Sequence, residues 1–101
     1  GENIYPREIE DLLFRHPAVA EVAVLGLPDA RWGEEVAAFV RPAAGRRIDR
    51  DELFTYVREH LAPHKTPRHW FELQAFPLTG SGKIQKFRLR ELWQRGELTP
   101  L

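Results

Sequence analysis

The stretch AEVAVLGLPDARWGEEVAAFVR, residues 20–41, contains two apolar segments separated by a polar one. Residues 20–26 (AEVAVLG) are short, apolar and rich in β-branched side chains, which predicts a strand. Residues 34–41 (EEVAAFVR) predict a second strand that stops at Pro42, and residues 27–33 (LPDARWG) are expected to form the loop between them. Two neighbouring strands therefore form the centre of the predicted fold.

A helix is expected before this pair of strands. It begins near Pro6, because the missing N–H of proline costs nothing in a first turn. Ile9, Leu12 and Leu13 have the i, i+3, i+4 spacing of a buried helical stripe. Pro17 ends the helix, since the residue before a proline is disfavoured in the α region.

A second helix and a third strand are expected after the pair. Residues 42–47 (PAAGRR) form a turn, and Asp49 with Glu52 three residues later resembles a capping box at a helix start. Pro63 ends this helix, and residues 68–73 (RHWFEL) predict the third strand. The apolar residues at helical spacing that form its buried stripe are Leu53, Val57 and Leu61.

The last expected helix runs from Gln85 to Gln94, after a loop at residues 77–82 (PLTGSG). Gly96 stands where a left-handed residue closes a helix. The apolar face of this helix consists of Leu89, Leu92 and Trp93. The order α-β-β-α-β-α predicts an α+β fold, a small three-stranded sheet with helices packed on it, in a single domain of residues 1–101.

The composition excludes several classes of site. The 101 residues contain no cysteine, so there is no disulfide, no thiolate nucleophile and no cysteine-built metal site, which agrees with a cytoplasmic location. No apolar run approaches the length of a transmembrane segment, and no signal peptide is visible. Methionine is also absent. We interpret the chain as a piece of a longer protein cut upstream of Gly1; a processed short protein is the alternative.

Charge is balanced overall but unevenly distributed. Residues 63–90 contain six basic residues and one acidic residue, within a chain of formal net charge zero. Such a segment suggests an anionic partner, and a solvated surface is the alternative. The segment also contains aromatic residues that would have to be exposed to stack on nucleic-acid bases, namely Trp70, Phe71, Phe76 and Phe87.

The residues Gly80-Ser81-Gly82-Lys83 look like the end of a phosphate-binding P-loop. That motif needs a glycine at position 77 and a hydroxyl residue after the lysine, whereas this chain has Pro77 and Ile84. No autonomous nucleotide site is therefore expected. Two glycines around a serine still place Lys83 on a loop that approaches another surface closely.

No catalytic set is complete within the chain. Ser81 has no general base near it in sequence, and the histidines show no metal-binding spacing except His60 and His64. Pro63 lies between these two and breaks the helical face that such a pair needs. No metal site is expected.

Three blocks of the sequence together resemble the C-terminal domain of the adenylate-forming acyl-CoA ligase superfamily. They are GENIYPREIEDLLFRHPAVAEVAVLGLPDARWGEEVAAFV (residues 1–40), LAPHKTPRHWFEL (61–73) and FPLTGSGKIQKFRLRE (76–91). The resemblance covers nearly the whole chain in the family's order. Its fatty-acyl and aryl-acyl branches are closer than its peptide-synthetase branch.

The resemblance implies the mobile C-terminal domain of an enzyme that first joins a carboxylic acid to ATP and then passes the acyl group to coenzyme A. It implies that Lys83 is the lysine of the adenylation step, supported by Thr79, Gly80, Ser81 and Gly82. Gly1 and Glu2 occupy the loop that faces the thioester step. The candidate contacts for the nucleotide end of coenzyme A are Arg31, Trp32, Lys65 and Arg68.

The resemblance also sets expectations for partners. The main partner is a large N-terminal adenylation domain of the same chain, absent here, which holds the acyl pocket, the hinge and the ATP-binding loop. ATP, magnesium, coenzyme A and the carboxylic acid bind the full-length enzyme; the isolated domain is expected to bind no cofactor and to be inactive. A stand-alone module that binds an anionic partner or nucleic acid through residues 63–90 is the alternative, and an inert structural domain is a third possibility.

Overall fold

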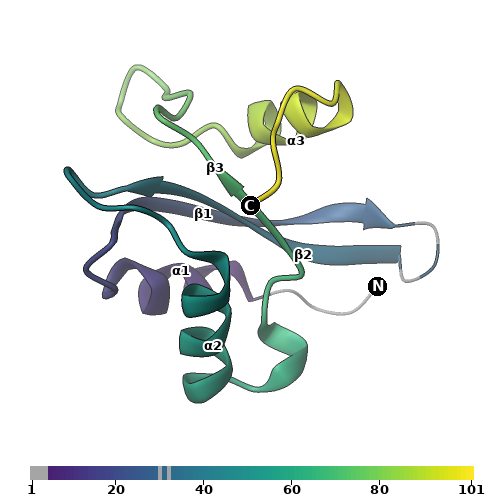
Figure 1. The fold of residues 1–101 in the computed structure, drawn as a ribbon. Coiled ribbons are helices and arrows are strands. Elements are labelled where there is room, and N and C mark those ends of the chain that lie inside the picture. The colour runs from purple at the N-terminus through teal and green to yellow at the C-terminus, as the bar shows by residue number, and fades with distance from the viewer. Residues whose placement is uncertain (1–4, 30, 32) are drawn as a thin grey trace.

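A three-stranded sheet forms the middle of the molecule in the computed structural model, which describes residues 5–29, 31 and 33–101 (Figure 1). β1 (Val19–Asp29) pairs antiparallel with β2 (Gly33–Pro42), and β3 (His69–Glu72) pairs parallel with β2. The strand order is β1-β2-β3, so β1 lies at an edge. The expected α+β order is confirmed, with a mixed sheet.

The predicted bounds of the loop between the first two strands, residues 27–33, are wrong. Leu27 and Pro28 continue β1 and pair with Glu35 and Glu34 of β2, and the register continues to the pair Asp29 and Gly33. A proline is tolerated here because β1 is an edge strand, where a missing N–H need not interrupt a ladder. The hairpin between the two strands is therefore longer and its loop shorter than the sequence suggested.

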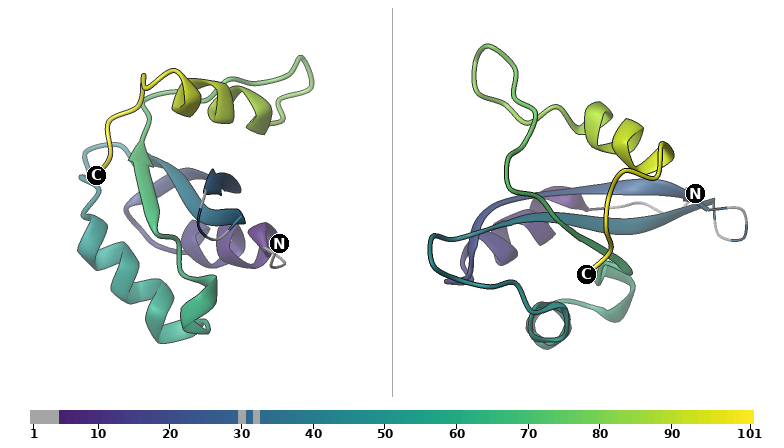
Figure 2. Two further views of the ribbon diagram at one scale, coloured as in Figure 1. Left: turned by 90° about the vertical axis from the view of Figure 1, so that its right-hand side faces the viewer. Right: turned by 45° about the horizontal axis from the view of Figure 1, so that its top comes forward.

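The helices cover both faces of the sheet (Figures 1 and 2). α1 (Pro6–Phe14) and α2 (Arg50–His60) lie on one face, and α3 (Lys86–Gln94) lies on the other. α2 and the short 3₁₀ helix η1 (Pro63–Lys65) connect the parallel strands β2 and β3. No helix among the described residues is both long and apolar enough to cross a membrane.

The sheet separates two apolar cores. Trp70 lies in the core beneath α1 and α2, with Leu53 and Val57 of α2. Its neighbour Phe71 lies in the opposite core with Leu89 of α3, as the alternation of side chains along a strand requires. The packing on both faces fixes the positions of α2, β3 and α3, which flank the candidate site residues.

Local signals explain where the helices begin and end. The Asp49 carboxylate accepts hydrogen bonds from the backbone N–H groups of Asp51 and Glu52, at 2.9 and 3.2 Å, so the predicted N-cap of α2 is confirmed. The Glu52 carboxylate lies 2.7 Å from Nε2 of His16. Gly96 has a φ of 69° and closes α3 as predicted.

Candidate functional site

Lys83 lies in a short hairpin, residues 77–85, that projects between β3 and α3 (Figure 1). Leu78 and Ile84 form an antiparallel bridge near its base. The Thr79 N–H donates to the Lys83 carbonyl at 2.8 Å, and the Lys83 N–H donates to Oγ1 of Thr79 at 3.0 Å. Both backbone groups of Lys83, the N–H and the carbonyl, are thus hydrogen-bonded to Thr79 in the opposite arm of the hairpin.

The tip of the hairpin is a tight turn. Gly82 has a φ of 86°, a region that disfavours any residue with a Cβ, and its N–H donates to the Thr79 carbonyl at 3.0 Å. The hydroxyls of Thr79 and Ser81 lie 3.0 Å apart. The residues expected to support the lysine therefore form its turn, and any movement that delivers Lys83 is expected to carry the hairpin as a unit.

The Lys83 side chain is exposed. Within residues 5–29, 31 and 33–101, no hydrogen bond or ion pair occupies its ammonium group. The charge is thus presented at the end of a projecting hairpin, where a separate surface can receive it.

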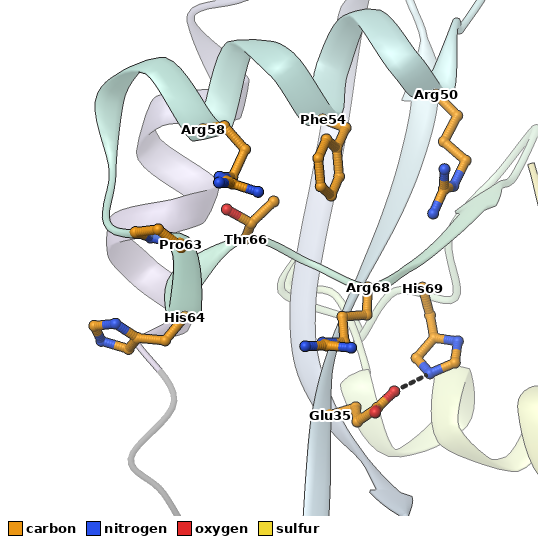
Figure 3. A pocket seen from close by; sticks show the side chains of 9 residues that line it. All are labelled: Glu35, Arg50, Phe54, Arg58, Pro63, His64, Thr66, Arg68 and His69. Atoms are coloured by element: carbon orange, nitrogen blue, oxygen red, sulfur yellow. Dashed lines mark hydrogen bonds and ion pairs between the residues drawn. The ribbon is translucent and has the colours of Figure 1, made fainter.

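Lys65 and Arg68, two candidate contacts for coenzyme A, face different surroundings. Nζ of Lys65 lies 2.7 Å from the Glu8 carboxylate and 4.7 Å from the centre of the Tyr5 ring, so it helps to hold α1. Arg68 is exposed and lines a cleft between α2, η1 and the start of β3 (Figure 3). The structure therefore does not bring these two side chains into one cluster.

The cleft is rich in basic side chains and has a volume of about 750 Å³. Arg50 and Arg58 extend from α2 on either side of Phe54, with guanidinium carbons 5.9 and 5.7 Å from its ring centre (Figure 3). Such cation–π contacts hold guanidinium groups in place while leaving their N–H donors available. The remaining lining residues are Glu35, Pro63, His64, Thr66, Arg68 and His69.

Arginines outnumber carboxylates by three to one among the described residues that line the cleft, and Arg50 also lies 3.7 Å from the exposed Asp51 carboxylate. The carboxylate in the lining, on Glu35, lies 2.7 Å from Nε2 of His69, at the side of Arg68 (Figure 3). The Thr66 hydroxyl is buried without a hydrogen-bond partner among the described residues. A ligand with several anionic oxygens fits this donor-rich lining.

Arg50 and Arg58 line the cleft but were not among the candidates from the sequence. Their spacing could have indicated them, because Arg50, Phe54 and Arg58 are at i, i+4 and i+8 and share one helical face. Of the other candidates, Arg31 is exposed in the turn between β1 and β2. Gly1, Glu2 and Trp32 lie outside the described residues.

The nucleic-acid alternative loses most of its support. Trp70, Phe71 and Phe76 are buried, which leaves Phe87 as the exposed aromatic residue of residues 63–90. Half of the six basic residues of that segment bind atoms of the domain itself: Lys65 binds Glu8, Lys86 binds Glu10, and Arg90 binds the Gly26 carbonyl. A stacking surface backed by a continuous basic face is therefore not formed there.

The histidines at positions 60 and 64 do not form a cluster that suits a metal. No group of three His, Cys, Asp or Glu side chains in the described part of the chain has metal-binding geometry. Nδ1 of His60 lies 2.7 Å from the Tyr56 carbonyl of the preceding turn, and His64 lines the cleft.

Comparison with known proteins gives one consistent family. The sequence model of the family described as the AMP-binding enzyme C-terminal domain matches residues 8–83. The feruloyl-CoA synthase of an Amycolatopsis species is 50% identical over 90 residues, which cover 89% of this chain and 18% of the synthase. The chain spans less than a fifth of the length of the curated relatives it matches.

Solved structures agree with the sequence comparison. A fatty acyl CoA synthetase of Mycobacterium tuberculosis superposes with a TM-score of 0.87 at 40% identity, covering 95% of this chain and 19% of that one. The ATP-bound MatB of Rhodopseudomonas palustris also gives a TM-score of 0.87, at 36% identity, covering 93% of this chain and 19% of MatB. At these identities the likeness extends beyond the fold to the family.

Proposed function

The chain belongs to the AMP-binding enzyme C-terminal domain family, the C-terminal domain of acyl-CoA synthetases, and from this premise we propose that it is the mobile lid of an ATP-dependent acyl-CoA ligase. Its partner is an N-terminal adenylation domain of the same polypeptide. The isolated domain is then inactive, because the acyl pocket and the ATP-binding loop belong to that partner. We also propose a cytoplasmic location, which rests on the cysteine-free composition.

The proposed reaction has two steps. In the first, a carboxylate oxygen attacks the α-phosphorus of ATP, the bond to the β-phosphate breaks, and acyl-adenylate and pyrophosphate form. In the second, the thiol of coenzyme A attacks the acyl carbon, and AMP leaves as the thioester forms. Magnesium would travel with the ATP phosphates, since the described residues offer no cluster of three metal ligands.

Lys83 is the residue of this chain to which we assign the first step. Negative charge gathers on the attacking carboxylate and on the α-phosphate as they approach, and an ammonium group placed between them offsets their repulsion. The single observation that carries the proposal is the presentation of Lys83, exposed and unpaired among the described residues, at the end of a hairpin closed by its own hydrogen bonds. Such a group reaches another domain without first breaking an ion pair of its own.

The basic cleft is the surface that we assign to the nucleotide end of coenzyme A. Arg58 and Arg68 supply guanidinium donors for phosphate oxygens, and Arg50 lines the same cleft. Arg31, Trp32 and Lys65 stay candidate contacts, although the Lys65 ammonium is engaged with Glu8. The cleft is lined largely by α2 and η1. These helices lie on the α1 side of the sheet, whereas the Lys83 hairpin leads into α3 on the other side (Figures 1 and 2). The two steps thus use different sides of the domain, which agrees with a lid that turns between them.

The test is Lys83→Ala in the full-length enzyme, with the two half-reactions measured separately. Acid-dependent pyrophosphate release is expected to fall by at least about 100-fold, the size of effect seen when one aimed donor is removed from a transition state. Conversion of supplied acyl-adenylate and coenzyme A to thioester is expected to change by less than about two-fold, because that step does not use the lysine.

Arg88→Ala is the matched control, since Arg88 is an exposed cation on α3 five residues further along the chain. It is expected to leave both half-reactions unchanged. Normal pyrophosphate release from the Lys83→Ala enzyme would refute the proposal.

A further inference from the structure

Side chains from α1 and α3 meet at the edge of β1 that pairs with no other strand, around the backbone of Val24. The Val24 N–H donates to Oε2 of Glu10 at 2.8 Å, and Nζ of Lys86 donates to the Val24 carbonyl at 2.9 Å. Nζ of Lys86 also lies 2.8 Å from Oε2 of Glu10. The ion pair and the two backbone groups of one residue therefore form a closed ring of hydrogen bonds.

A second contact continues this arrangement along the strand. The Arg90 guanidinium donates to the Gly26 carbonyl at 2.7 Å. Lys86 and Arg90 are four residues apart on α3, about 6 Å along a helix axis, and Val24 and Gly26 are two residues apart on β1, about 7 Å along a strand. The matching spacings let one face of α3 dock along the β1 edge.

These polar contacts help to fix the start of α3. Leu89 is the one buried residue among the nine of α3, all of which the structure describes. Gln85, the N-cap of α3, makes no side-chain capping bond within the described residues. Leu89 packs in the core, Ile84 and Trp93 pack against it on either side, and Lys86 adds a polar contact at the first turn.

The first turn of α3 is also the base of the Lys83 hairpin. The Gln85 N–H, one residue before α3, donates to the Pro77 carbonyl at 2.9 Å and closes the hairpin at its base. Lys83 itself lies three residues before Lys86 in the chain. A rotation of the first turn of α3 would therefore displace the whole hairpin and its terminal ammonium.

We propose that the Glu10–Lys86 ion pair positions the Lys83 hairpin for the adenylation step. The proposal rests on the proposed function. We assign Lys86 a positioning role, because its ammonium binds Glu10 and the Val24 carbonyl of its own domain.

The test uses Lys86→Met and Glu10→Gln in the full-length enzyme, well below the unfolding temperature of each variant. Both substitutions remove the ion pair, and Gln still offers an acceptor to the Val24 N–H. The kcat of acid-dependent pyrophosphate release is expected to fall about ten-fold in each, since small displacements of a catalytic group reduce rates strongly. Thioester formation from supplied acyl-adenylate is expected to stay within about two-fold of the wild-type rate.

Three further variants separate positioning from a general effect on folding. Lys86→Arg keeps a cation with several donors and is expected to restore most of the adenylation rate. The double variant of Glu10→Gln and Lys86→Met is expected to be little worse than either single one, because both break the same pair. Arg88→Met, on the exposed side of the same helix, is expected to leave both steps unchanged.

The results that would overturn the inference are distinct from those that would overturn the proposed function. Adenylation within two-fold of wild type in Lys86→Met, an equal loss in both half-reactions, or no rescue by Lys86→Arg each contradicts the positioning role. Lys83→Ala is measured in parallel. If that variant loses adenylation while Lys86→Met does not, the inference alone fails; if it keeps adenylation, both fail.

Discussion

Gly82, the residue before Lys83, has a φ of 86°, whereas Gly80 on the other side of Ser81 does not have a positive φ. An added Cβ would meet no atom within 4 Å at either position. The two glycines therefore differ in backbone strain and not in the space around them. We predict that Gly82→Ala destabilises the native turn by about 1–2 kcal/mol, while Gly80→Ala leaves it intact.

The measurement for this pair is acid-dependent pyrophosphate release by the full-length enzyme. Gly82→Ala is expected to lower it about ten-fold, the equivalent of about 1.4 kcal/mol, and Gly80→Ala less than about two-fold. Equal losses from the two substitutions would contradict this explanation. They would show that the glycines are needed for close approach of the backbone to another domain and not for the turn.

Thr66, in the lining of the basic cleft, is 5% exposed and its hydroxyl has no partner among the described residues. Its extended backbone, with φ −77° and ψ 126°, suits any β-branched residue. Valine has nearly the same shape without the unsatisfied group. We predict that Thr66→Val stabilises the domain by up to about 1 kcal/mol in urea unfolding. A loss of stability would instead reveal a hydrogen-bond partner for the hydroxyl, such as an ordered water.

At the scale of an element, α2 carries two arginines of the cleft, and Asp49 caps its first turn. Asp49→Ala removes the acceptor for two backbone N–H groups, and we predict a loss of about 1 kcal/mol in the free energy of unfolding. Asp51→Ala is the control, since the Asp51 side chain is 92% exposed and lies 3.7 Å from Arg50. An exposed pair of this kind contributes little, so a loss below about 0.5 kcal/mol is expected.

The helices and strands could be predicted because their signals are local. Pro6, Asp49 and Gly96 act on the turn in which they lie, and the predicted ends of α1, α2 and α3 agree with the structure to within about two residues. The end of β1 could not be predicted, since Pro28 breaks a central strand but not an edge strand. Which strand lies at the edge depends on the pairing of β2 with β3, some 30 residues away.

The same distinction separates the candidate residues that the sequence indicates from those that only the structure indicates. Lys83 and its glycines form a contiguous motif, so the sequence alone predicted that a loop presents this lysine. The cleft combines α2, η1, β2 and β3, and its lining follows from the crossover between parallel strands. Lys65 and Arg68 are three residues apart, yet the 3₁₀ turn and the start of β3 direct them to different neighbours.

At the scale of the whole molecule, the sheet lies between the two candidate sites. The Lys83 hairpin continues into α3 on one side, and the basic cleft is lined by α2 and η1 on the other, as Figure 1 indicates. If both sites serve one partner domain, as we propose, this domain must turn as a body between the two steps. Substitutions in the two sites are therefore expected to impair different steps.

The last prediction concerns the cleft. Arg58→Ala and Arg68→Ala in the full-length enzyme are each expected to raise the KM for coenzyme A about ten-fold at low salt, the size of one charge-assisted contact at a partly exposed site. The effect should shrink as ionic strength rises, because exposed charges are screened. Acid-dependent pyrophosphate release should stay unchanged, since that step does not involve coenzyme A. Arg15→Ala removes an exposed cation that does not line the cleft and serves as control. If both cleft variants keep the wild-type KM at every salt concentration, coenzyme A does not use this cleft, and its nucleotide must be sought at Arg31, Trp32 or Lys65.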